Sequence, residues 1–227
     1  MGIILYPYIY SQHRMIDKRK FLMTEMAKIE KKYSDTKSHI LDVGYQLLAQ
    51  KGFTAVGLKQ ILDTAGIPKG SFYHYFESKE AFGEEIIKQY LLNYKTRLNT
   101  LSSKSISGQQ KLYEYFKSWY NTQKDVCSGE KCLIVKLSGE VSDISDIMRQ
   151  ALAKTYQTII DWISDQIKIG WEDGSLIQKE NISAECIASR WYYTWLGASL
   201  VTKISQSEVP LTKVWNMMHC ELGYQSK

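Results

Sequence analysis

One pattern near the start of this chain limits its fold more than any other feature. Apolar residues recur at helical spacing over residues 36–51 and 58–65, and a short third stretch follows at 69–75. The Gly-Ile-Pro sequence at 66–68 separates the last two, because glycine permits a sharp turn and proline suits the first turn of a helix. A helix, a tight turn and a second short helix form the helix-turn-helix arrangement, whose second helix enters the major groove of DNA. We therefore predict a DNA-binding unit over residues 35–82.

The starts of these helices are expected to supply phosphate contacts. Thr36 and its two predecessors can cap the first helix, which we expect to begin there and to end at Gly52. Helix starts carry free backbone amides that bind anions, so those near Thr36 and Leu58 are expected to face DNA phosphates. Gly57 stands before the second helix, where its backbone amide can serve in the same way.

The short third helix is expected to contact DNA directly. Phe72 and Phe76 are four residues apart and are expected to point into the core. Ser71 and His74 can then reach base edges, and Tyr73 can pack on a sugar and donate to a phosphate. The residues predicted to contact DNA are Thr36, Gly57, Lys69, Gly70, Ser71, Tyr73, His74 and Lys79.

Two residue types in this set have distinct roles. Gly70 leaves one flank of the helix thin, so that the backbone can approach DNA closely, and Lys69 and Lys79 suit phosphates. For Tyr73 and His74 the alternative is an ordinary solvated face, which any short surface helix presents.

Charge does not by itself identify a nucleic-acid surface in this chain. Residues 1–35 hold seven Lys or Arg against four Asp or Glu, residues 36–82 hold five against four, and residues 83–227 hold seventeen against sixteen. The basic excess lies mainly in the first segment, so the prediction of DNA binding depends on the motif. Lys59 is expected to be an ordinary solvent-exposed lysine and not a DNA contact.

Residues 1–34 form an N-terminal extension with two interpretations. The apolar start at 3–10 has no basic stretch before it and no small-residue cleavage site after it, unlike a signal peptide. One interpretation is that the natural protein starts at Met26 and the upstream stretch is not part of it. The other is a basic arm that touches DNA through Arg14, Lys18, Arg19 and Lys20.

Residues 83–227 are predicted to form a helical bundle behind the DNA-binding unit. Helical apolar spacing recurs through this region, and seven or so helices suit a bundle. The expected fold class is therefore all-α, with an N-terminal three-helix helix-turn-helix domain followed by a C-terminal sensing and dimerisation bundle.

The last two helices are predicted to form a dimerisation face, with simple internal core as the alternative. They carry more apolar surface than one small bundle needs, and small residues at 197–199 permit close helix approach. A dimer holds two recognition helices about 34–36 Å apart, the spacing of successive major grooves. The residues assigned to this face are Ile187, Trp191, Trp195, Leu196, Ala198, Leu200, Val214, Met217 and Met218.

A family resemblance rests on the same N-terminal residues. Gly52-Phe53, Ile61-Leu62 and the run from Ala65 to Phe82 closely resemble the DNA-binding signature of the TetR family of transcriptional repressors. The resemblance implies a homodimer that binds a palindromic double-stranded DNA operator. One departure is Val56-Gly57, where the family usually has two hydroxyl residues, so a side-chain phosphate contact is expected to be lost there.

Cys132 is the candidate sensor residue of the bundle. It lies at the start of a predicted helix, where peptide dipoles and free amides favour a thiolate, and Lys131 and Lys136 add positive charge. A thiolate is nucleophilic, so this side chain is a candidate for oxidation or alkylation. The alternative is a buried, inert thiol.

A second resemblance concerns residues 129–143 and 195–205. They are similar to the N-ethylmaleimide-responsive subgroup of the TetR family, which senses electrophiles and reactive oxidants. The resemblance implies that Cys132 is the sensor and that Lys203 pairs with it, the alternative for Lys203 being a solvated lysine. Cys127 is left open as a resolving thiol. Cys186 and Cys220 are expected to be buried and inert.

Two other functions are alternatives to this hypothesis. A repressor could instead bind a small apolar ligand reversibly in an aromatic pocket. The aromatic residues that could line one are Trp119, Tyr120, Tyr156, Trp162, Trp171, Tyr192 and Tyr193. A cysteine-dependent enzyme is not expected, because none of the four histidines has an evident acidic or amide partner near Cys132.

Cysteine usage and hydropathy favour a cytoplasmic protein without metal or cofactor. Four scattered cysteines do not suggest a disulfide framework, and none forms a C-x-x-C pair with downstream histidines. No apolar run approaches the roughly 20 residues that span a bilayer, so no membrane contact is expected.

Overall fold

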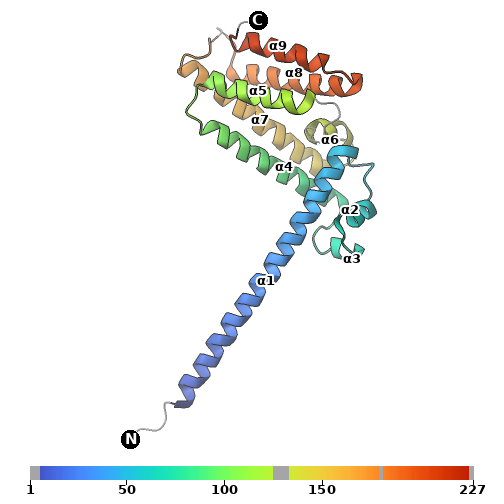
Figure 1. The fold of residues 1–227 in the computed structure, drawn as a ribbon, viewed down its shortest axis with the longest axis vertical. Helices are drawn as coiled ribbons and strands as arrows, with labels where there is room; N and C mark the ends of the chain where they lie inside the picture. Colours follow the sequence, from blue (N-terminus) through green and yellow to red (C-terminus); the bar gives the residue numbers. More distant parts are fainter. Residues whose placement is uncertain (1–5, 125–132, 179–180, 225–227) are drawn as a thin grey trace.

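The computed structural model describes residues 6–124, 133–178 and 181–224, with residues 6–22 described by their backbone alone. Every regular element within these ranges is an α-helix, which confirms the all-α prediction (Figure 1). None of the described helices is both long and apolar enough to cross a bilayer. In chain order the helices are α1 (Tyr6–Lys51), α2 (Leu58–Ala65), α3 (Lys69–Phe72), α4 (Lys79–Ser102), α5 (Gly108–Lys124), α6 (Leu133–Val141), α7 (Asp146–Glu172), α8 (Ala184–Ser205) and α9 (Val209–Glu221).

The C-terminal part of α1 forms the predicted helix-turn-helix together with α2 and α3. Gly66 ends α2 in the left-handed conformation, with a φ of 66°, and its amide donates to the Asp63 carbonyl. That backbone angle explains why glycine stands at the turn. Phe72 and Phe76 are buried, as predicted, and their rings lie 5.5 and 4.9 Å from that of Phe82 on α4.

The first helix is far longer than predicted. It begins at Tyr6 instead of near Thr36 and continues to Lys51. Thr36 Oγ1 donates to the Lys32 carbonyl at 2.8 Å, so Thr36 lies within the helix and no free helix-start amides are available there. Residues 24–35 contain neither proline nor glycine, which lets the helix continue through the capping residues. α1 therefore projects from the rest of the structure as one rod (Figure 1).

The body is built around α7, which packs against α4, α5, α6 and α8, while α9 lies on α5 and α8 (Figure 1). Aromatic residues fill the space between α5 and α8. The rings of Phe116 and Trp195 lie 5.1 Å apart, and Trp119 Nε1 donates to Ser199 Oγ at 3.1 Å. The buried apolar residues of the helix-turn-helix and of the body form one continuous cluster, so the two units pack as one structure.

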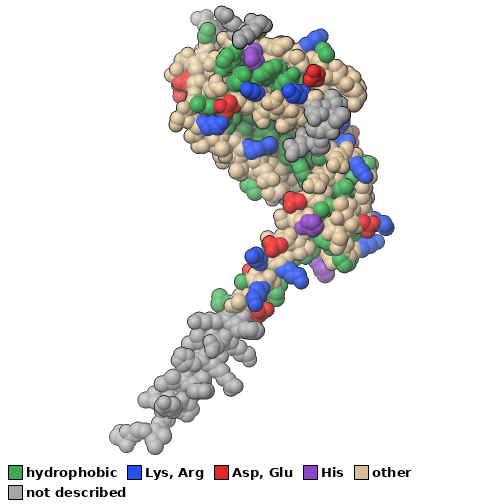
Figure 2. Space-filling model, viewed as in Figure 1, with side chains coloured by type: hydrophobic (Ala, Val, Ile, Leu, Met, Phe, Trp, Pro, Cys, Tyr) green, Lys and Arg blue, Asp and Glu red, His purple; other side chains and the backbone are tan. Residues whose placement is uncertain are grey.

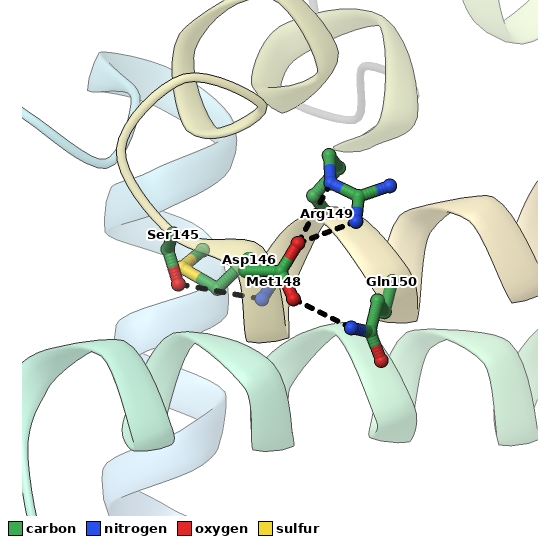
Figure 3. A network of polar contacts seen from close by, with 5 residues as sticks. All are labelled: Ser145, Asp146, Met148, Arg149 and Gln150. Atoms are coloured by element: carbon green, nitrogen blue, oxygen red, sulfur yellow. Dashed lines mark hydrogen bonds and ion pairs between the residues drawn. The ribbon is translucent and has the colours of Figure 1, made fainter.

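The corner between α6 and α7 is fixed by a helix cap (Figure 3). Ser145 precedes α7 with an extended backbone, and its hydroxyl accepts from the Met148 amide at 3.3 Å. In the first turn of α7, Asp146 accepts from Arg149 and from Gln150. The hydrogen bonds from Arg149 and Gln150 lower the pKa of Asp146. A Ser cap followed by an acidic first turn favours a sharp helix start, which sets where α6 ends.

The predicted dimerisation face requires a correction. Five of its residues lie inside the protomer core, namely Ile187, Trp191, Trp195, Ala198 and Met218. Leu200 and Met217 are exposed, as a contact face would require. The other large apolar side chains exposed on α8 are Tyr193, Val201 and Ile204, which the sequence interpretation did not assign. Of the buried or exposed residues on α8, the exposed stripe thus keeps Leu200 from the prediction and adds Tyr193, Val201 and Ile204.

Candidate nucleic-acid interface

α3 presents the side chains predicted to contact DNA. Lys69, Gly70, Tyr73 and His74 are exposed, and Ser71 is half-exposed. The helix itself ends at Phe72, and the chain continues as turns in which the His74 amide donates to the Ser71 carbonyl at 3.2 Å. Tyr73 is 58% exposed although its ring packs at right angles to the Phe72 ring. The predicted recognition residues thus share one outward surface.

Gly70 is not required by packing within the chain. A Cβ atom built on Gly70 would meet no heavy atom within 4 Å, and its φ is not in the left-handed region. The open space beside this residue lies outside the folded chain. Such a position suits close approach of an external backbone, which is the role predicted for it.

The start of α2 also faces outward. Gly57 is exposed, precedes α2 with φ of −80° and ψ of 153°, and no side chain caps the helix there. No side-chain cap therefore competes with an anion at this helix start, and the phosphate contact at Gly57 stays a prediction. Val56, in the place of a family hydroxyl, is fully buried in the core.

Lys79 has internal partners that the sequence did not indicate. Its Nζ donates to the Phe53 carbonyl at 2.8 Å and lies 4.3 Å from the centre of the Phe53 ring. Burial lowers the pKa of Lys79, against the opposing effect of nearby Glu80 and Glu140. One of the three ammonium donors of Lys79 is therefore occupied within the fold, and this residue ties the start of α4 to the loop after α1.

A carboxylate from the body holds the same loop. Glu140, near the end of α6, accepts the Phe53 amide at 3.0 Å and also the Thr54 amide. Burial alone would raise the pKa of Glu140, but these hydrogen bonds and the nearby Lys136 outweigh it and lower the pKa. Gly52 has a φ of 89°, and a Cβ there would lie 2.4 Å from the Glu140 carboxylate. We name this arrangement of Glu140 with residues 52–54 the Glu140–loop contact.

The sequence did not indicate a contact between the extension and the turn that follows α3. Tyr33 Oη donates to the His74 carbonyl at 2.9 Å, and the Tyr33 and Tyr75 rings lie 4.5 Å apart. This part of α1 lies outside the predicted unit of 35–82, so no motif pointed to it. Basic and acidic side chains alternate along it, as Lys28 paired with Glu25 illustrates (Figure 2).

The predicted sensor residues are only partly within the described structure. Cys132 and Cys127 lie outside the described residues, as does Lys131. α6 begins at Leu133, immediately after Cys132, and packs on α1, α7 and α8. Lys203 is half-buried in the last turn of α8.

The other cysteines differ from the prediction. Cys186 and Cys220 are exposed instead of buried, and neither is in a disulfide. Cys186 lies in the first turn of α8, where its backbone amide donates to the Ser183 hydroxyl, and the residue is exposed. Both residues thus provide exposed thiols for comparison with Cys132.

The aromatic residues proposed to line a ligand pocket mostly pack against each other. Tyr192 lies 5.5 Å from Trp119 and 6.4 Å from Tyr156, measured between ring centres. Trp162 Nε1 donates to Ser102 Oγ at 2.8 Å. Of the seven candidates, Trp119 alone lines the cavity of about 550 Å³ between α1, α4 and α5. The described residues include no group of three or more His, Cys, Asp or Glu placed to hold a metal ion.

These features define a helix-turn-helix regulator with an attached helical body. Residues 40–86 match the model of the family described as bacterial regulatory proteins, tetR family. The chain is 39% identical over 186 residues to the HTH-type transcriptional repressor NemR of Escherichia coli K12, which covers 78% of this chain and 88% of the relative. It is 30% identical over 176 residues to the repressor DhaR of Mycobacterium sp. GP1, covering 77% and 86%. The chain belongs to the TetR family and is a NemR-like transcriptional repressor.

Solved structures agree with this assignment. The reduced form of E. coli NemR superposes with a TM-score of 0.78 at 37% identity, over 85% of this chain and all of that one. A TetR-family regulator from Agrobacterium tumefaciens has a TM-score of 0.74 at 18% identity, over 83% and 98% of the two chains. The second comparison shows the fold alone.

Proposed function

We propose that this TetR-family repressor binds a palindromic operator as a homodimer and is released when an electrophile or oxidant modifies Cys132. The observation that carries the proposal is the Glu140–loop contact, which joins α6 directly to the helix-turn-helix. Cys132 immediately precedes α6 in the sequence. A change at the sensor therefore acts on a helix that holds the DNA-binding unit in place.

The proposed chemistry needs no cofactor. Lys131 and Lys136 flank Cys132 in sequence, and cations near a thiol favour the nucleophilic thiolate. With N-ethylmaleimide, the Cys132 sulfur forms a bond to one alkene carbon and the C=C π bond breaks. The released electron pair goes to the neighbouring carbon, which takes a proton from water, and nothing leaves.

Release of DNA follows from the position of α6. This helix packs on α1, α7 and α8, so a shift of its start caused by an adduct at Cys132 would be passed to these neighbours. Glu140 moves with α6, and the Phe53 and Thr54 amides that it accepts belong to the loop between α1 and α2. A shift of this loop reorients the recognition surface, a change of the kind that interfaces with two discrete arrangements support.

The homodimer is proposed to form through the exposed stripe of α8 together with α9. Leu200 and Ile204 are 47% and 72% exposed on α8, and Met217 is 58% exposed on α9. Gly197 lies in the same stripe, and a Cβ there would meet nothing within 4 Å. Large exposed apolar side chains beside a glycine with free space around it suit close contact with the same two helices of a second protomer. Dimerisation sets the spacing of the two recognition surfaces that a palindromic operator requires.

The test compares cysteine variants in operator binding. Reduced protein is titrated onto duplex DNA from the chain's own upstream region, with and without N-ethylmaleimide, at a fixed and stated salt concentration. The native protein is expected to bind this duplex more tightly than random sequence and to lose affinity after alkylation. Cys132→Ser is expected to bind equally well and to keep its affinity in the presence of the reagent.

A matched control uses the exposed cysteines. The double variant Cys186→Ser, Cys220→Ser removes two accessible thiols and is expected to respond to the reagent as the native protein does. If Cys132→Ser still loses operator affinity on alkylation, the sensor assignment is wrong. If the reduced native protein is monomeric or shows no preference for its own upstream duplex, the operator and dimer proposal is wrong.

A further inference from the structure

A cavity of about 550 Å³ lies between the DNA-binding unit and the body. α1 contributes Leu41, Asp42 and Tyr45 to its lining, and the remainder comes from α4 and α5. Its volume falls within the range of roughly 300–1,000 Å³ that is usual for small-molecule sites. Trp119 belongs both to its lining and to the aromatic cluster between α5 and α8.

The cavity has an apolar, aromatic floor and a polar rim. Tyr90, Leu98, Tyr115 and Trp119 are buried and form its floor. The exposed lining residues are all polar or charged, namely Asp42, Gln89, Asn93, Arg97 and Ser118. An aromatic floor under a polar rim suits a ligand with a flat apolar body and a polar end that remains near solvent.

Two of the aromatic rings that line the cavity are stacked on each other. The Tyr45 ring on α1 is stacked with the Tyr90 ring on α4 at 6.3 Å, with an interplanar angle of 18°. Deeper in the cavity the hydroxyls of Tyr94 and Tyr115 lie 2.8 Å apart. Burial raises the pKa of Tyr115 well above its ordinary value, so its phenol remains protonated and neutral at physiological pH. Several π faces and a neutral hydroxyl pair therefore surround the space.

One cation at the rim indicates the charge of the ligand. The Arg97 guanidinium lies 4.7 Å from the centre of the Tyr94 ring, and no carboxylate in the described part of the chain forms an ion pair with it. Of the two lining carboxylates, Glu114 is paired with Lys104 and Asp42 is exposed on α1. A guanidinium positioned over a neighbouring ring can donate two parallel hydrogen bonds to a carboxylate.

We propose that this cavity is a binding site for a planar aromatic carboxylate, with the ring over the tyrosine and tryptophan floor and the carboxylate at Arg97. Such a ligand would contact α1 of the DNA-binding unit together with α4 and α5 of the body. It would therefore touch both the DNA-binding unit and the body. This proposal does not depend on the thiol chemistry proposed above.

The test uses 2-naphthoate as the probe and its saturated analogue, decahydro-2-naphthoate, as the matched control. Binding to the full chain is measured by isothermal titration calorimetry. One saturable site per chain is expected for 2-naphthoate. The analogue is expected to bind several-fold more weakly, because contacts between aromatic faces contribute about 0.5–1.5 kcal/mol beyond burial of area.

Two variants locate the site. Arg97→Gln is expected to weaken 2-naphthoate binding about tenfold, since it removes a charge-assisted hydrogen bond. Ser118→Trp places a large ring at an exposed position of the rim and is expected to abolish binding. Arg149→Gln, a change of the same kind at an exposed arginine on α7 outside the cavity, is expected to leave binding unchanged.

Each of three results would overturn the proposal. The first is that 2-naphthoate shows no saturable binding, the second is that the saturated analogue binds equally well, and the third is that Arg97→Gln binds 2-naphthoate with native affinity. Circular dichroism confirms folding of each variant, and Arg97→Gln remains decisive if Ser118→Trp does not fold. Cys132→Ser is expected to bind the probe like the native protein, so failure of the cavity proposal and failure of the thiol proposal give different results.

Discussion

Replacing Glu140 by alanine tests the contact on which the proposed switch depends. The carboxylate accepts two backbone amides, from Phe53 and from Thr54. Phe53 is 3% exposed, so its amide would lose its partner with little access to water, at a cost of about 1–3 kcal/mol. Thr54 is exposed, and solvent would replace its bond at little net cost. We expect Glu140→Ala to lower the free energy of unfolding by about 2 kcal/mol.

Glu140→Gln separates the charge from the hydrogen bond. The two amides bind different carboxylate oxygens, Phe53 to Oε2 and Thr54 to Oε1, so a glutamine in the same position keeps one acceptor and turns its NH2 group toward the other amide. We expect a loss of about 1 kcal/mol, roughly half the effect of alanine. Glu172→Ala is the matched control, because this glutamate is exposed at the end of α7, and we expect its effect to lie within about 0.5 kcal/mol of zero.

The assays are urea unfolding followed by circular dichroism and operator titration with and without N-ethylmaleimide. If α6 acts through this contact, Glu140→Ala binds the operator with altered affinity and shows a reduced response to alkylation. Two results would refute the reasoning. One is an unfolding free energy equal to that of Glu172→Ala, and the other is an undiminished response to alkylation.

The contact also predicts the sign of a pH effect. The amide hydrogen bonds hold the pKa of Glu140 below its ordinary value of 4.5 in the folded state. A lowered pKa stabilises the fold above the unfolded-state value, and this stabilisation is lost as the pH falls through the folded-state value. The difference in unfolding free energy between native protein and Glu140→Gln is therefore expected to be constant near neutrality and to shrink below about pH 4.5.

Three further substitutions test other parts of the structure. Gly52→Ala forces a side chain into a left-handed conformation and against the Glu140 carboxylate, and it should cost about 1–2 kcal/mol or more, seen as a lower melting temperature. An unchanged melting temperature would contradict this account of Gly52. Gly197→Leu should leave the protomer fold intact, since nothing within 4 Å opposes the new side chain, yet shift sedimentation toward the monomer. A stable dimer in that variant would place the interface elsewhere. Lys69→Ala should weaken operator binding and reduce the slope of log affinity against log salt by about one, whereas Lys59→Ala, whose ammonium is paired with Asp63, should leave the slope unchanged. Equal slopes for the two variants would argue against a phosphate contact at Lys69.

The helix-turn-helix could be predicted because its determinants are local. Gly66 adopts the left-handed φ that a tight turn requires, and the spacing of Phe72 and Phe76 places both on the buried face. Each signal lies within a few residues of the structure that it specifies. The start of α1 was mispredicted for a related reason, because Thr36 can cap a helix but does not prevent one from continuing through it.

The faces of α8 could not be assigned from periodicity. Apolar residues occur on both sides of this helix, with Trp191 and Trp195 buried and Leu200 and Ile204 exposed. Helical spacing shows which residues share a face, but it does not show which of two apolar faces meets the rest of the chain. Only the packing of α7 and α9 against α8 distinguishes the core face from the exposed one.

The Glu140–loop contact had no sequence signal, because its partners lie 86 and 87 residues apart. Glu140 in isolation is one acidic residue near the end of an amphipathic helix, and Gly52 in isolation is a helix terminator. Together they couple the two units: the glycine leaves room for the carboxylate, and the carboxylate binds amides that the turn exposes. In the switch proposed above, this contact is the one that would be kept or broken. A contact between the two units joins segments that are far apart in the sequence, so local patterns are least able to predict it.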